Sequence, residues 1–364
     1  MRTLIHRRTS AGGAPAPRRP AARTALFALA LLLAPWPAAA ELLLPPGFTA
    51  QVYVTGEGFD TDASRGVRGF PSSSTLTFDH TGALYLARSG RRYIGGEVYD
   101  RSPLYRIPVG GARLTPDSEA RYFYGPPLPN PQVAGTRRAR ELLVTTFDRE
   151  RRIGALYRMI DGRAELFAGG TPERGLQPVM RQPEGVAVDS AGNVYVADRT
   201  QGLVIRLDGD GRVVDPRYYA ITRPRLLAVD DGDRLWVGSD GNAEAPIQPG
   251  PGEIVQISPQ GAPGVVHRGP VPAGFGLSPT NRLFVADRHE RQIFIVAPDG
   301  KRVAFASFTE NDAPRGLCFA PITPETKRAG VAGDLFVIMI RGGAWPVNEV
   351  VRISGPFDDF AGQR

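Results

Sequence analysis

Short apolar segments separated by tight polar turns recur along most of the chain. The pattern is visible in STLTFDHTGALYLA from Ser74, EGVAVDSAGNVYVA from Glu184, RLLAVDDGDRLWVG from Arg225 and AGFGLSPTNRLFVA from Ala273. Each segment is an apolar run, a turn and a second apolar run, which is typical of two antiparallel strands. The turn residues fit this interpretation, because Asp accepts backbone N–H groups at the start of a turn and Gly tolerates positive φ. These segments therefore predict repeated β-hairpins.

A second turn follows in each repeat, as in LYRIPVGGARL, LYRMIDGRAEL, VIRLDGDGRVV, IVQISPQGAPGVV and IFIVAPDGKRVAF. An apolar strand precedes each turn and another follows it, so each unit is predicted to be a four-stranded antiparallel meander. From Asp189 to Asp230 is 41 residues, and from Asp230 to Ser278 is 48. Periods of about 40–50 residues with four strands each are typical of β-propeller blades, which close into a ring.

The spacing predicts six such units. The 110 residues from Asp79 to Asp189 contain one further, degenerate unit, made of ELLVTTFD, GALYRMI and AELFAGG, and the sixth unit begins at Pro314. This last unit lacks an outer strand after Gly355, whereas a strand-like segment, Thr49 to Gly56, precedes the first unit. We therefore predict an all-β, six-bladed propeller over residues 41–364, in which the N-terminal strand completes the last blade.

The excess positive charge of the chain is concentrated in its first 40 residues. The formal net charge is +7. The leader contains no acid and six arginines, which are Arg2, Arg7, Arg8, Arg18, Arg19 and Arg23. The remaining 38 basic and 37 acidic residues nearly balance, which argues against a nucleic-acid partner, since that would need clustered positive charge on the folded part. The single cysteine, Cys318, excludes an intramolecular disulfide framework and a c-type haem.

Residues 1–40 have the three parts of a secretory signal peptide. A basic region runs to Arg23, an apolar region follows from about Ala25 to Ala34, and Ala38 and Ala40 form an A-x-A cleavage site. The apolar region is shorter than the ~20 residues of a transmembrane helix, with a retained N-terminal anchor as the alternative. We expect export to the periplasm or the medium by the Sec or the twin-arginine route. The mature protein is expected to be a monomer without stable membrane insertion.

The segment QPEGVAVDSAGNVYVADRTQGLVIRLDGDGRV, from Gln182 to Val213, resembles an NHL-type propeller repeat. The two ends of the mature chain, LLPPGFTAQVYVTG and GDLFVIMIRGGAWPVNEVVRISGPFDDFAG, resemble soluble quinoprotein sugar dehydrogenases of the glucose/sorbosone type. That resemblance implies pyrroloquinoline quinone with calcium, and a His as general base. The chain is also similar to the six-bladed regucalcin/gluconolactonase group, which implies one divalent metal held by Glu, Asn and Asp. The residues that could supply these ligands are Glu184, Asp240 and Asn242.

Arginines recur in register where the repeats reach one face of the predicted ring. Second strands end at Arg88, Arg199, Arg288 and Arg341, first strands begin beside Arg225 and Arg315, and two acids, Asp198 and Asp287, accompany the first set. Guanidinium groups bind carboxylate or phosphate in a bidentate manner. A ring of these residues at the channel mouth would therefore bind an anionic small molecule or a quinone carboxylate. The structural alternative is that each Arg pairs with an Asp of the neighbouring blade.

The same face is expected to carry three expanded connections, about Arg88 to Arg101, Ser239 to Pro251 and Arg341 to Val347. Trp345, in the last of them, would either stack on a ring-shaped ligand or cap the core of the sixth unit. His289 is the histidine expected on this face after cleavage. It is therefore our candidate general base, with an exposed loop histidine as the alternative.

The sequence thus predicts an exported propeller that binds a small anionic or sugar-like ligand, or a peptide, at the channel mouth. Two enzyme classes are the alternatives: a quinone-dependent sugar or alcohol dehydrogenase, and a metal-dependent lactonase or hydrolase. The fold alone does not choose among them, because propellers host unrelated functions.

Overall fold

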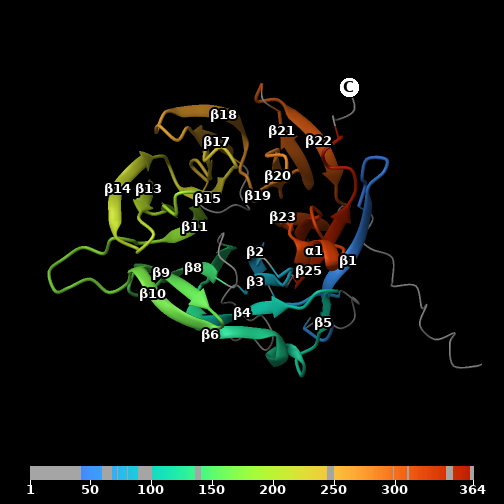
Figure 1. The fold of residues 1–364 in the computed structure, drawn as a ribbon, viewed down its shortest axis with the longest axis horizontal. Coiled ribbons are helices and arrows are strands. Elements are labelled where there is room, and N and C mark those ends of the chain that lie inside the picture. The colour runs from blue at the N-terminus through green and yellow to red at the C-terminus, as the bar shows by residue number, and fades with distance from the viewer. Residues whose placement is uncertain are drawn as a thin grey trace, which may run out of the picture. The chain divides into compact units, whose positions relative to one another are not determined.

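A computed structural model describes residues 42–59, 68–71, 73–79, 81–88, 101–135, 141–243, 250–297, 299–309, 311–341 and 347–360. The predicted signal peptide, residues 1–40, lies outside these ranges. The described residues form six β-sheets around a common axis (Figure 1). Within these ranges, no helix is long and apolar enough to cross a membrane. The predicted all-β, six-bladed propeller is therefore confirmed.

Each blade contains four antiparallel strands, and its first strand lies nearest the ring axis (Figure 1). Blade one contains β2 (Ser73–Phe78), β3 (Leu84–Arg88), β4 (Arg101–Ile107) and β6 (Phe123–Pro129). Blade two contains β7 (Gln132–Gly135), β8 (Glu141–Asp148), β9 (Ile153–Ile160) and β10 (Arg163–Gly169). Blade three contains β11 (Pro183–Val188), β12 (Val194–Asp198), β13 (Leu203–Leu207) and β14 (Val213–Ala220).

The remaining three blades follow the same order. Blade four contains β15 (Pro224–Val229), β16 (Leu235–Ser239), β17 (Pro251–Ile257) and β18 (Pro263–Pro270). Blade five contains β19 (Gly274–Leu277), β20 (Leu283–Asp287), β21 (Gln292–Val296) and β22 (Arg302–Ser307). Blade six contains β23 (Asp312–Phe319), β24 (Leu335–Arg341), β25 (Val347–Ser354), β1 (Thr49–Gly56) and β5 (Ala112–Leu114).

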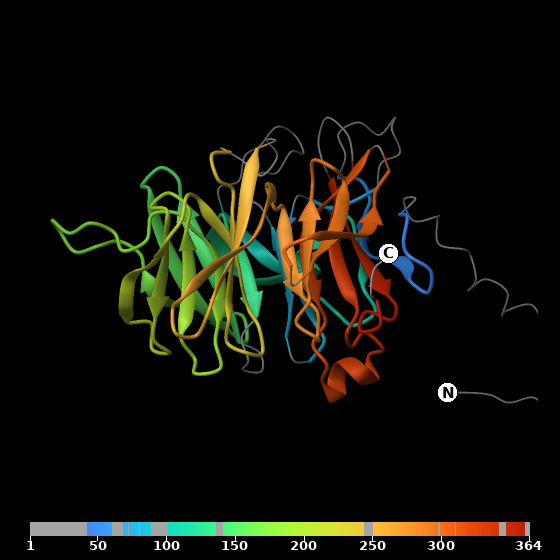
Figure 2. The same ribbon diagram turned by 90° about the horizontal axis from the view of Figure 1, so that it is seen from above.

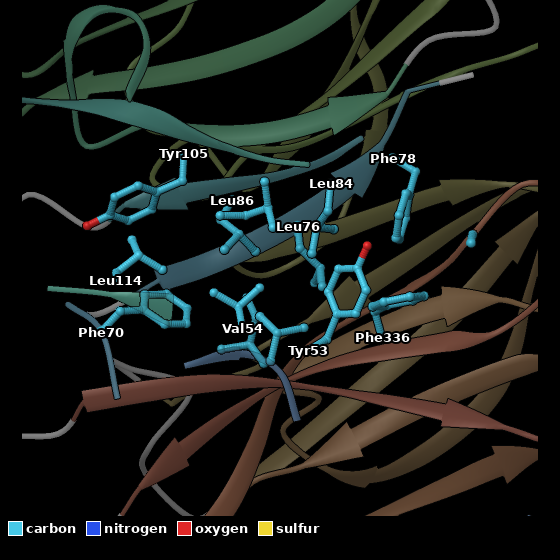
Figure 3. Close-up of a cluster of buried hydrophobic side chains, with 14 of the residues drawn as sticks. Tyr53, Val54, Phe70, Leu76, Phe78, Leu84, Leu86, Tyr105, Leu114 and Phe336 are labelled. Carbon is cyan, nitrogen blue, oxygen red and sulfur yellow. The ribbon is translucent and has the colours of Figure 1, made fainter. Parts of the chain in front are cut away.

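The ring closes through the N-terminal strand, as the sequence predicts. β1 pairs antiparallel with β25, with Thr49 opposite Ser354 and Val52 opposite Val351. The inner strand β2 contacts β23, so the last blade lies beside the first. Between these blades Val54, Leu84 and Phe336 are fully buried, and the Tyr53 ring packs edge-on against Phe336 with centroids 4.9 Å apart (Figure 3). Apolar burial therefore holds the closing strand in addition to its hydrogen bonds.

The first unit departs from the predicted simple meander. β5 does not fold back on β4; it pairs in parallel with β1, with Val54 opposite Ala112. Blade one is completed by β6 after a short 3-10 helix, η3 (Glu119–Tyr122). Leu114 of β5 is fully buried in the cluster between blades six and one. The meander prediction is wrong at this point, because burial of Leu114 against the closing strand competes with a local hairpin.

The connections lie on two opposite faces of the ring. The upper face, as named here, carries the turns from the second to the third strand of each blade and the entries into the first strands. The lower face carries the other turns and the helix α1 (Pro324–Arg328), which lies at the bottom of Figure 2. α1 lies in the connection between β23 and β24, and the Thr323 hydroxyl caps it by accepting the N–H of Thr326.

One hydrogen-bond arrangement repeats in the lower turns. A buried Asp accepts hydrogen bonds from backbone N–H groups of the turn. It accepts a further hydrogen bond from the O–H or N–H group of an aromatic side chain six residues later. The pairs are Asp79 with Tyr85 (3.0 Å), Asp189 with Tyr195 (3.1 Å) and Asp230 with Trp236 (3.0 Å). In blade five the corresponding residues are Ser278 and Phe284, so the carboxylate and its aromatic donor are replaced together. This pairing explains why an aromatic donor occupies an otherwise apolar strand position.

Candidate functional site

On the upper face, Asp240 connects three neighbouring blades. Its carboxylate is fully buried and accepts from Nε of Arg199, at 3.2 Å, and from Nε of Arg225, at 2.8 Å. Arg199 follows β12 in blade three, and Arg225 lies on the inner strand of blade four. Arg225 also donates to the carbonyls of Pro272 and Ala273, at the entry to blade five. These contacts correspond to the structural alternative of the sequence analysis, in which arginines tie adjacent blades.

Glu184 adds a second carboxylate to this cluster. It begins the inner strand of blade three and accepts from Nε2 of Gln182 at 2.9 Å. Desolvation raises the pKa of Glu184, while Arg225 and then Arg199 oppose that rise. The cluster of Glu184, Asp240, Arg199 and Arg225 therefore contains two carboxylates and two guanidiniums and is balanced in charge.

The predicted metal ligands do not fit a divalent cation in this arrangement. Both carboxylate oxygens of Asp240 already accept from guanidinium groups, which would repel a metal ion. Asn242 is exposed, and its backbone carbonyl accepts from Nη1 of Arg223 at 2.6 Å. Across the described ranges, no three His, Cys, Asp or Glu side chains are grouped so that they could hold a metal.

Two further predicted arginines pair with acids of their own blade. Arg341 lies 3.4 Å from Asp312 and 3.1 Å from Glu349. Arg88 is buried, lies 3.0 Å from Glu119 and has its guanidinium 5.6 Å from the centroid of the Phe123 ring. Arg88 therefore belongs to the interior of blade one, away from the cluster around Asp240.

Asp198 and Asp287 fix the upper hairpins of blades three and five. The Asp198 carboxylate, which is fully buried, accepts the backbone N–H groups of Arg181 (2.6 Å) and Gln201 (3.0 Å). Asp287 accepts those of His289 (3.0 Å) and Glu290 (2.9 Å), and burial raises the pKa of Asp287. Both acids thus act on the backbone of the turn that positions the arginine beside them.

Arg288 differs from the other arginines of the set. It follows Asp287 and is half-buried, and desolvation lowers its pKa. Among the described residues, no side chain or carbonyl pairs with its guanidinium. Arg315 lies on β23 of the adjacent blade and is also half-buried. Arg288 is therefore a desolvated cation of blade five for which the described residues supply no partner.

The strand register explains why Arg288 differs from Arg199. Leu235 and Leu335 begin the second strands of blades four and six, and each pairs with the last residue of its inner strand. Counting from these residues, Ile340 occupies in blade six the position of Asp240 in blade four. Arg288 follows Asp287 in blade five as Arg199 follows Asp198 in blade three, but the residue at the Asp240 position of the next blade, Ile340, is apolar and buried. The sequence contains this difference between Asp240 and Ile340, but the two positions are recognised as equivalent only when the register of β24 is known.

His289 and Trp345 complete the predicted set. His289 is exposed in the hairpin between β20 and β21, and no side chain in the described part of the chain hydrogen-bonds to its ring. It therefore lacks the acid that would orient a general base. Trp345 lies outside the described residues, as do 89–100, 244–249 and 342–346 of the three expanded connections.

Comparisons with known proteins agree with this architecture. Residues 180–204, which include β11 and β12, match the NHL repeat family model. The molecule is therefore a six-bladed β-propeller that carries an NHL repeat, and the resemblance found in the sequence is confirmed for that segment. No curated protein matches the chain as a sequence.

Solved structures share the fold at low identity. A PQQ-bound aldose sugar dehydrogenase from Streptomyces coelicolor is 14% identical, with 86% of this chain and 100% of that chain covered and a TM-score of 0.53. An auxiliary nutrient binding protein from Bacteroides thetaiotaomicron is 12% identical, with 84% and 76% covered and a TM-score of 0.54. A virginiamycin B lyase from Staphylococcus aureus is 13% identical, with 84% and 99% covered and a TM-score of 0.47. At such identities the likenesses to the dehydrogenase and the nutrient binding protein concern the fold alone and leave the function open.

Proposed function

We propose that this protein is a ligand-binding β-propeller that holds a small carboxylate-bearing molecule at its upper face, beside blades five and six. The observation that supports this proposal is Arg288, which is half-buried on the upper face and whose guanidinium pairs with no acid among the described residues. Burying an unpaired charge costs free energy, so such a group is expected to be retained where a ligand supplies the opposite charge. A planar guanidinium binds a carboxylate through two parallel hydrogen bonds.

The proposal is tested by titrating the purified protein with citrate, gluconate, benzoate and pyrroloquinoline quinone, followed by calorimetry. A charge-assisted hydrogen bond contributes about 1.5–3 kcal/mol, so Arg288→Met should weaken binding of the active probe roughly tenfold to a hundredfold. Arg217→Met, at an exposed arginine on β14, is the matched control and should bind as the parent does. Equal binding by Arg288→Met, or no binding of any probe to the parent, would reject the proposal.

The two enzyme alternatives, a quinone-dependent dehydrogenase and a metal-dependent lactonase, are distinguished by activity assays on the same purified protein. The dehydrogenase named above is bound to a quinone that carries carboxylates, which is why this quinone is among the probes. Dye-linked oxidation of sugars after addition of the quinone and calcium would favour a dehydrogenase. Hydrolysis of lactones that a chelator stops would favour a metal-dependent lactonase. Carboxylate binding without either activity would favour the binding protein proposed here.

A further inference from the structure

A pocket of about 570 Å³ opens on the lower face, opposite the site proposed above. Blade one supplies Asp79 and Thr81 from its first turn, Tyr85 from β3, Arg106 from β4, and residues 121–124 from η3 and β6. Blade two supplies Asp161, from the turn between β9 and β10. The pocket therefore lies where two blades meet, and neither the predicted arginine set nor the comparisons involve it.

Buried hydrogen bonds hold the floor of this pocket rigid. The Tyr85 hydroxyl donates to Oδ2 of Asp79 at 3.0 Å and accepts from Nε of Arg106 at 3.0 Å. Asp79 and Tyr85 are both buried, with 3% and 2% of their surfaces exposed. Asp79 also accepts the N–H groups of Thr81 and Ala83, so its oxygens are fully used. The Arg106 guanidinium is thereby fixed by one nitrogen, and no group in the described ranges accepts from its two terminal nitrogens.

The walls of the pocket combine aromatic rings with further polar groups. Tyr124 is half-buried, and its ring meets that of Tyr85 edge-on with centroids 5.0 Å apart. Arg121 is exposed, and no group in the described part of the chain pairs with its guanidinium. Asp161 adds a carboxylate at the opposite wall. The lining residues that the structure describes include two arginines and two aspartates, so their formal charges balance.

This combination points to the class of ligand. A rigid pocket with several donors, a carboxylate and aromatic rings matches a molecule that has many hydroxyls and an apolar C–H face. A neutral sugar ring has both features, because its hydroxyls donate and accept while its C–H face lies against an aromatic ring. A carboxylate ligand fits less well, because Asp79 and Asp161 offset the two guanidiniums. We infer that the lower pocket between blades one and two binds a neutral carbohydrate.

The experiment is saturation-transfer NMR on the purified protein with glucose, galactose and mannose, and with glucuronate as the charged counterpart. At least one neutral sugar should bind saturably. Arg121→Ala, an exposed position whose loss does not threaten the fold, should weaken that binding about tenfold or more. Tyr124→Leu should weaken it as well, whereas Tyr124→Phe keeps the ring and should retain it within about threefold.

The control is Arg217→Ala, which removes an exposed arginine from blade three and should leave sugar binding unchanged. The inference is overturned if none of the neutral sugars binds, or if Arg121→Ala and Tyr124→Leu both bind as the parent does. It is also overturned if glucuronate binds more than about tenfold better than every neutral sugar. Arg288→Met should not affect this binding, so failure here is distinguishable from failure of the carboxylate site.

Discussion

Arg199, Arg225 and Arg288 carry the same side chain on the same face, yet their surroundings differ in charge. Asp240 pairs with both Arg199 and Arg225, whereas the residue at the corresponding position of blade six, Ile340, is apolar. Removing a buried charge that has a partner lowers the stability of a protein, whereas removing a desolvated charge that has none can leave the stability unchanged or raise it. Stability measurements can therefore separate the arginines that hold blades together from the one proposed to bind a ligand.

We predict that Arg225→Met lowers the free energy of unfolding by about 3 kcal/mol, because it leaves a buried carboxylate with fewer partners. Arg288→Met should leave that free energy within about 0.5 kcal/mol of the parent or raise it, because it removes a desolvated cation that has no partner among the described residues. Urea denaturation without added ligand measures both. A large loss in Arg288→Met would show that this arginine has a structural partner and would contradict its assignment to a ligand.

The pairing of a turn carboxylate with an aromatic donor gives a second prediction for single residues. Tyr195→Phe removes the hydroxyl that donates to Oδ2 of Asp189 at 3.1 Å and should cost about 1–2 kcal/mol of stability. Tyr219→Phe, at a half-buried tyrosine of the same blade whose hydroxyl has no partner among the described residues, should change stability by less than about 0.5 kcal/mol. Thermal denaturation compares the two variants, and equal effects would contradict the proposed role of the buried hydrogen bond.

The sequence predicted residues for the upper face, and its structural alternative foresaw arginines paired with an Asp of a neighbouring blade, but it did not identify which Asp. The repeated spacing placed Arg199 and Arg225 at the ends of strands, and that placement holds. Their common partner, Asp240, was interpreted as a metal ligand, because a carboxylate in a sequence does not show what faces it. Ile340 was overlooked, because β24 continues to Arg341 and the equivalence with Asp240 appears only in the strand register.

At the scale of elements, β5 is the segment that the repeat pattern could not assign. Its residues follow an ordinary turn, but they pair with β1, which lies in another blade. The local pattern of apolar and polar residues does not determine a pairing with a strand so far away in the sequence. Gly111 makes the choice possible: its φ is +89°, and a Cβ built there would lie 2.0 Å from the carbonyl oxygen of Tyr53. The strand β7 also lay outside the pattern, because it is only four residues long.

Two adjacent glycines test this packing. Gly110 has φ +96° with no atom near the Cβ position, so Gly110→Ala should cost about 1 kcal/mol from backbone strain alone. Gly111→Ala adds a clash with the backbone of the closing strand and should cost about 2 kcal/mol more. Urea denaturation of the two variants gives the difference. If both variants lose the same stability, β5 does not press against β1 as described.

In the molecule as a whole, the segment proposed to direct export, residues 1–40, lies just before β1, the strand that closes the ring. We propose that residues 1–40 direct export and are removed after Ala40, as the A-x-A pattern indicates. The cut would leave β1, which begins at Thr49, intact for ring closure. Mass spectrometry of the exported protein should therefore find Glu41 at its N-terminus, and a chain that retains residues 1–40 would contradict the proposal.

Closure also predicts how truncation acts. Removal of residues 1–40 should leave the unfolding transition unchanged, since none of the described blade contacts involves them. Removal of residues 1–56 deletes β1 and takes Tyr53 and Val54 from the cluster between blades six and one, which leaves edges of β25 and β5 unpaired. An open ring exposes apolar surface and strand edges, so this variant should bind a hydrophobic dye and lose its sharp transition. A cooperative transition at the temperature of the longer chain would mean that the last blade is stable without the first strand, and the ring would then be held by its inner strands alone.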